Sequence, residues 1–120
     1  MENQTARLKT TAHEDVTVVE LMDQKILDES SIAQIGEQLY ALAAAVPTPR
    51  IVLDFTHVAH MSSSALGMLI TLHKRVREKD GRLWLCRICP SIYEVFVITR
   101  LNEVFTICET REAALRAATS

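Results

Sequence analysis

The sequence predicts a single α/β domain with a mixed, mostly parallel sheet, an antiparallel N-terminal strand and about four helices. The length of 120 residues is that of one domain. Apolar, β-branched segments alternate with segments that carry apolar residues at helical spacing. The intervening connections are long enough to join parallel strands. We place the domain at residues 6–120 and expect the polar residues 1–5 to be frayed.

The strands are predicted from short runs of apolar and β-branched residues. Arg7 to Thr11 alternates weakly, as an edge strand can, and Val16 to Leu21 is a stronger strand signal. The run Ile51 to Phe55 is almost continuously apolar, which is typical of a strand buried on both faces of a parallel sheet. Leu83 to Cys86 and Val104 to Ile107 complete the predicted sheet.

The helices are predicted from apolar residues spaced three and four apart. Each helix has a start signal, either a capping side chain or a proline in the first turn. These signals are Asp28, the run Met61-Ser62-Ser63-Ser64, Pro90 and Thr110. Pro47 and Pro49 end the first helix, and Asp80-Gly81 ends the second, with Gly81 expected in the left-handed cap position.

Composition excludes several classes of function. Thirteen basic and fifteen acidic side chains give a net charge of −2, which argues against a nucleic-acid interface. Aromatic residues make up only 5%, too few for a base-stacking platform. No apolar run approaches the roughly 20 residues of a membrane span, and the N-terminal segment lacks the apolar core of a signal peptide. We therefore expect a cytoplasmic domain that binds neither nucleic acid nor membranes.

The strongest functional signal is the serine cluster Ser62-Ser63-Ser64 at the start of the second predicted helix. A single serine is enough to cap a helix, which is worth about 1 kcal/mol. A helix N-terminus also carries about half a positive charge and open N–H donors. A phosphate on one of these serines would add about −1.5 to −2 charge without unfolding the domain. Plain capping and a phosphorylation site are both consistent with the pattern.

The sequence around this cluster resembles the signature of STAS domains, and more narrowly that of bacterial anti-sigma factor antagonists. The resemblance rests on the strand Ile51 to Phe55, followed after five residues by Met61-Ser62-Ser63-Ser64-Ala65-Leu66-Gly67. It extends to Ile26-Leu27-Asp28 and to Ile98-Thr99-Arg100-Leu101. It covers nearly the whole domain, from Val16 to Ala117.

The resemblance implies a regulatory protein-binding domain that is not an enzyme and needs no cofactor or metal. It implies binding to an anti-sigma factor that is also a serine kinase, phosphorylation at Ser63, and a serine phosphatase that resets the switch. It also allows a weak homodimer. Ser62 and Ala65 stand where the family has aspartate and glycine, so Ser62 and Ser64 remain alternative targets. The implied partner-binding residues are Asp28, Asp54, Met61, Ser62, Ser63 and Ser64.

Four of the polar residues near the cluster also have structural interpretations. Asp28 fits a helix cap, and Asp54 fits a turn-stabilising hydrogen bond. His57 and His60 are expected to be polar loop residues, because no oxyanion site or nucleophile elbow accompanies them.

Two alternative functions stay open. One is a non-phosphorylated STAS scaffold or sensor-interaction module, which the substitutions at positions 62 and 65 favour. The other is a thiol oxidoreductase that uses the C-x-x-C pair Cys86 and Cys89. A reactive thiol of that kind must be exposed at a helix N-terminus, whereas Cys86 is expected inside a strand. We therefore interpret both cysteines as buried structural thiols.

Overall fold

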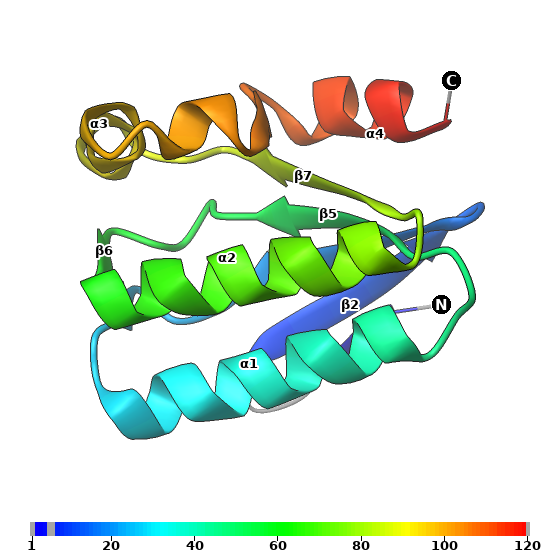
Figure 1. Ribbon diagram of the computed structural model, residues 1–120, viewed down its shortest axis with the longest axis horizontal. Helices are drawn as coiled ribbons and strands as arrows, with labels where there is room; N and C mark the ends of the chain where they lie inside the picture. The colour runs from blue at the N-terminus through cyan, green and yellow to red at the C-terminus, as the bar shows by residue number, and fades with distance from the viewer. Residues whose placement is uncertain (1, 5–6, 120) are drawn as a thin grey trace.

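The computed structural model describes residues 2–4 and 7–119 and confirms the α/β class: a mixed sheet with helices on both faces (Figure 1). The strand order is β1-β2-β3-β5-β7-β8. Pairing is antiparallel from β1 to β3 and parallel from β3 to β8. The strands are β1 (Glu2–Gln4), β2 (Leu8–His13), β3 (Val16–Leu21), β5 (Arg50–Asp54), β7 (Arg82–Cys86) and β8 (Thr106–Cys108).

Two layers of helices cover the sheet. Helices α1 and α2 lie side by side on one face, and α4 lies on the other (Figure 1). The helices are α1 (Glu29–Ala44), α2 (Ser63–Glu78), α3 (Pro90–Ile98) and α4 (Arg111–Thr119), with a 3₁₀ turn, η1, at Leu101–Glu103. Near the C-terminal end of α4, the Ala118 carbonyl accepts a hydrogen bond of 2.8 Å from Arg50, the first residue of β5. Within the described residues, none of these helices is both long and apolar enough to span a bilayer.

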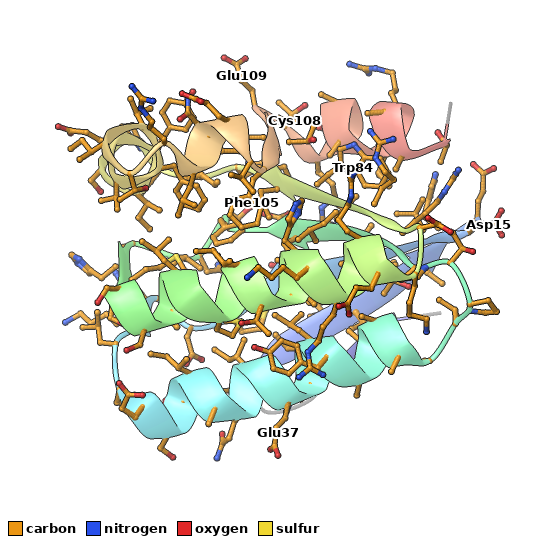
Figure 2. The ribbon with its side chains drawn as sticks, viewed as in Figure 1. Asp15, Glu37, Trp84, Phe105, Cys108 and Glu109 are labelled. Atoms are coloured by element: carbon orange, nitrogen blue, oxygen red, sulfur yellow. The ribbon has the colours of Figure 1, made fainter. Side chains whose placement is uncertain are left out.

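The two faces of the sheet are built by residues that alternate along each strand. In β7, Leu83 and Leu85 enter the larger core beneath α1 and α2, while Trp84 and Cys86 enter the smaller core beneath α4. Figure 2 shows Trp84 between the sheet and α4, and Phe105 on the side of α2. Both faces are therefore buried, which explains the nearly continuous apolar runs of the central strands.

Helices α1 and α2 begin at the same end of the molecule, beyond one end of the strands (Figure 1). Asp28 caps α1 as predicted, because its carboxylate accepts a hydrogen bond of 2.9 Å from the Ser31 N–H. Just before the two helices, β4 (Lys25–Ile26) pairs with β6 (His60–Met61) in a parallel two-stranded sheet. This small sheet, which sequence patterns did not predict, joins the entrances of the two helices.

The N-terminal residues differ from the expectation that residues 1–5 are frayed. Glu2–Gln4 form β1, which pairs with β2, so β2 is not the edge of the sheet. The polar residues Glu2–Gln4 give no strand signal of their own. They form a strand because the backbone N–H and C=O groups along β2 offer them hydrogen-bond partners. Met1 and Thr5 lie outside the described residues.

The end of α2 also differs, because Asp80 adopts the left-handed conformation (φ 58°) that was predicted for Gly81. Gly81 is needed for a different reason: a Cβ atom there would lie 2.2 Å from the Pro49 carbonyl oxygen. The close approach of the two chain segments that enter β5 and β7 therefore excludes a side chain at this position.

The last strand begins two residues later than predicted, at Thr106 rather than Val104. The preceding turn, η1, carries the chain into the core, where the Phe105 ring meets the rings of Phe96 and His73 edge-on. No residue of the turn itself is buried, and Phe105 after it reaches the core, so apolar composition alone did not distinguish this segment from a strand.

Candidate functional site

The serine cluster lies at the start of α2, and each of its three hydroxyl groups has a different environment. Ser62 is the N-cap, and its Oγ accepts a hydrogen bond of 3.3 Å from the Ala65 N–H. Ser64 donates a hydrogen bond of 3.0 Å to Oε1 of Glu29 in the first turn of α1. Ser63 is exposed, and its hydroxyl has no hydrogen-bond partner among the described residues. Only Ser63 therefore presents a hydroxyl that is both open and uncommitted.

The direction in which Ser63 points follows from helix geometry. Ser64 and Met68 are four residues apart and share the face of α2 that meets α1. The Met68 carbonyl accepts a 3.4 Å hydrogen bond from the Tyr40 hydroxyl, which confirms the direction of this face. Ser63 and Gly67 lie about 100° further round the helix. A Cβ atom on Gly67 would have no neighbour within 4 Å, so this side of α2 is open to another macromolecule.

The electrostatics of this edge combine a helix dipole with two carboxylates. The first turn of α2 contains no acidic residue, so its partial positive charge is not neutralised within the helix. Hydrogen bonds from the Ser31 side chain and backbone lower the pKa of Asp28, which is therefore ionised at neutral pH. Asp28 and Glu29 place negative charge beside the hydroxyl cluster. An added phosphate would thus meet favourable N–H groups on α2 and unfavourable carboxylates on α1.

The other predicted residues of the site are distributed unevenly. Met61 is half-buried and packs against the larger core, so it contributes only part of its side chain to this surface. Leu27, directly before the Asp28 cap, is 50% exposed and adds an apolar side chain to the same edge. One edge of the molecule therefore carries Asp28, Ser62, Ser63 and Ser64. Met61 lies between this edge and the larger core.

Asp54 does not reach this surface, because its side chain is buried. One carboxylate oxygen accepts hydrogen bonds from the Thr56 N–H, at 2.9 Å, and from the Thr56 hydroxyl. The other oxygen accepts a hydrogen bond of 2.9 Å from Nε of Arg111, whose Nη2 lies 2.7 Å away. This arrangement matches the turn-stabilising interpretation of Asp54.

A charged network around Asp54 was missed by the sequence analysis. Arg111, at the start of α4, also forms an ion pair of 3.2 Å with Glu20, and Glu20 in turn binds the ring of His57. Nothing in the local sequence around Glu20 or His57 predicts this contact. The position of Arg111 does carry a signal: a cation in the first turn of a helix opposes the helix dipole, so it is expected to have carboxylates nearby.

Of the C-x-x-C pair, Cys86 is buried as predicted and Cys89 is not. Cys86 is buried, and this burial raises the pKa of its thiol to about 12. Cys89 is not buried but partly exposed as the N-cap of α3. Burial tends to raise the pKa of Cys89, but hydrogen bonds from Ser91 and Ile92 outweigh burial and lower it. The expectation of two buried thiols is wrong for Cys89, because Arg87 adopts a left-handed conformation (φ 58°) that turns the chain away from the sheet.

Comparisons with known proteins agree with this fold. Residues 7–114 match the STAS domain family. The chain is 38% identical over 85 residues to BtrV of Bordetella bronchiseptica, which bears the name of an anti-sigma factor antagonist; the match covers 68% of this chain and 73% of BtrV. It is 23% identical over 103 residues to the anti-sigma F factor antagonist of Paenibacillus polymyxa, over 86% of each protein.

A solved structure gives the same result. The anti-sigma-factor antagonist (STAS) domain protein of Planctomyces limnophilus superimposes with a TM-score of 0.87 at 27% sequence identity. The superposition covers 96% of this chain and all of that one, 100%. The chain therefore belongs to the STAS domain family and groups with its anti-sigma factor antagonists.

Proposed function

We propose that this domain binds an anti-sigma factor through the edge formed by the starts of α1 and α2, and that phosphorylation of Ser63 releases the partner. The proposal places both proteins in the cytoplasm, with the partner acting as the serine kinase and a phosphatase restoring the free hydroxyl. The observation that carries the proposal is the exposed, uncommitted Ser63 hydroxyl at the N-terminus of α2. The resemblance of the Met61–Gly67 motif to the family signature supports it.

The chemistry is a phosphoryl transfer from ATP. The Oγ atom of Ser63 forms a bond to the γ-phosphorus, the bond from that phosphorus to the β,γ-bridging oxygen breaks, and ADP leaves. The hydroxyl proton passes to a base supplied by the kinase. Because Ser63 is the first residue of α2, the phosphate lies against the positive end of the helix and the fold can hold it without rearranging.

The switch acts through charge at the interface. Phosphorylation adds about −1.5 to −2 charge at pH 7 to an edge that already carries Asp28 and Glu29. A partner surface shaped for the neutral hydroxyl would have to desolvate that charge on binding, and like charges placed face to face at an interface cost several kcal/mol. Partner binding is therefore lost while the domain stays folded.

The test is site-resolved phosphorylation. The purified chain is incubated with Mg²⁺-ATP and a cell extract of the source organism, and the modified residue is mapped by peptide mass spectrometry. We expect one phosphate, on Ser63, and none in the Ser63→Ala variant. The Ser62→Ala variant loses a helix cap but keeps the Ser63 hydroxyl, and should still be phosphorylated. A phosphate found only on Ser62 or Ser64 contradicts the assignment, and no phosphate at all favours the scaffold alternative.

Gly67 provides a second test, because the fold itself does not require a glycine there. An added Cβ meets nothing within 4 Å, and alanine is about 1 kcal/mol more favourable than glycine inside a helix. We expect Gly67→Ala to raise the free energy of unfolding by about 0.5–1 kcal/mol, measured by urea denaturation. The same variant should bind the partner more weakly, because the methyl group stands four residues from Ser63 on the open face. Unchanged affinity would show that the partner does not cover this face.

A further inference from the structure

We propose that Glu29 determines which hydroxyl of the serine cluster is phosphorylated, by shielding Ser64 and leaving Ser63 as the acceptor. This inference rests on the proposed function, since it concerns the selectivity of the same modification. Glu29 acts as a positioning residue and takes no part in the transfer itself. It follows the helix cap Asp28 and belongs to a different helix from the serines.

The contacts of the cluster support this selection. Ser62 is committed to the α2 cap through the Ala65 N–H. The Ser64 hydroxyl donates a hydrogen bond of 3.0 Å to Oε1 of Glu29, and the packing of α1 against α2 holds the two groups together. Ser63 points about 100° away from that contact. Two of the three hydroxyls are therefore engaged by the protein itself.

Charge makes the shielding of Ser64 stronger than the hydrogen bond alone. ATP is an anion, and a phosphate on Ser64 would sit beside the Glu29 carboxylate. A carboxylate can assist a hydroxyl by accepting its proton, as the base of a kinase does. Here the Glu29 carboxylate also repels the anionic ATP and the phosphate that would form on Ser64. Because the kinase supplies its own base, repulsion is the effect that remains, and Glu29 disfavours transfer to Ser64.

Removing the carboxylate should therefore spread the modification. In the extract assay, we expect Glu29→Ala to raise the ratio of phosphoserine at Ser64 to that at Ser63 by about tenfold, from the Coulomb energy of two charges a few ångströms apart at an exposed site. Glu37→Ala is the matched control, because Glu37 is exposed on the same helix and points away from α2 (Figure 2). It should leave the ratio unchanged. Melting curves verify that both variants are folded.

A thiol probe tests the same shielding without a kinase. Ser63→Cys and Ser64→Cys are made separately in a Cys89→Ser background, which removes a partly exposed native thiol. The reagent is 5,5′-dithiobis(2-nitrobenzoate), a dianion that resembles the incoming phosphate in charge. A neighbouring anion raises the pKa of a thiol and slows attack on an anionic disulfide. Glu29→Ala should accelerate the reaction at position 64 about tenfold and at position 63 less than about twofold.

The outcomes separate the two proposals. If the wild-type chain is phosphorylated at Ser63 but Glu29→Ala changes neither the site ratio nor the contrast in thiol rates, the inference about Glu29 is wrong and the proposed function stands. If the wild-type chain acquires no phosphate, the proposed function fails, and the thiol rates still decide whether Glu29 shields position 64. Equal acceleration at both positions would show that Glu29 acts on the whole edge and does not select between hydroxyls.

Discussion

Replacing Ser63 with aspartate should weaken binding of the anti-sigma factor by about 2–5 kcal/mol, roughly thirtyfold to several thousandfold in Kd. The substitution puts a permanent negative charge on the open face of α2, which the proposed partner would have to cover on binding. The melting temperature should stay nearly unchanged, because an anion in the first turn of a helix is tolerated or favoured. Isothermal titration calorimetry with the purified partner measures the affinity, and circular dichroism measures the melting temperature.

The matched control for this experiment is Ser63→Ala. It removes the phosphorylatable hydroxyl without adding charge, so it should bind the partner with nearly the affinity of the unmodified chain. It should also stay bound in the presence of ATP, when the wild-type chain is released. Equal affinity of the aspartate and alanine variants would argue against a charge-based switch at this position.

Replacing Leu69 with alanine should lower the free energy of unfolding by about 2–5 kcal/mol, as is typical when a leucine is truncated in a closed core. Leu69 lies on the inner face of α2, is fully buried and belongs to the larger core. The cavity left behind is bordered by the sheet on one side and by neighbouring helix residues on the other. Urea denaturation monitored by circular dichroism gives the free energy directly.

Lys74→Ala is the control for the core variant, since Lys74 is exposed on the same helix. Surface substitutions of this kind usually change stability by less than about 0.5 kcal/mol. A loss below about 1 kcal/mol for Leu69→Ala would contradict the placement of this residue in a tightly packed core.

The parts of the fold that could be predicted from the sequence are those that depend on local patterns of residues. The β3 and β5 strands and the α2 helix follow from apolar spacing. The caps at Asp28 and Ser62 follow from side chains that reach only three residues along the chain. The same local chemistry located the serine cluster at a helix N-terminus. No contact between distant segments was needed for these conclusions.

Most of the features that the sequence concealed depend on segments that meet only in the folded chain. Glu29 reaches Ser64 because α1 and α2 pack side by side, and the buried carboxylate of Asp54 is neutralised from α4 by Arg111. Gly81 is required by the backbone at Pro49. Cys89 was misplaced for a local reason: arginine seldom adopts positive φ, so the turn at Arg87 had no signature in the sequence.

The hydrogen bond from Arg50 to the Ala118 carbonyl has a practical consequence. It fastens the last turn of α4 to the beginning of β5, at the opposite end of the molecule from the start of α2 (Figure 1). A dye, a solid support or a fused reporter attached beyond Ala118 would consequently lie on the side of the domain opposite the start of α2. The surface proposed to bind the anti-sigma factor would remain accessible in such a tethered assay.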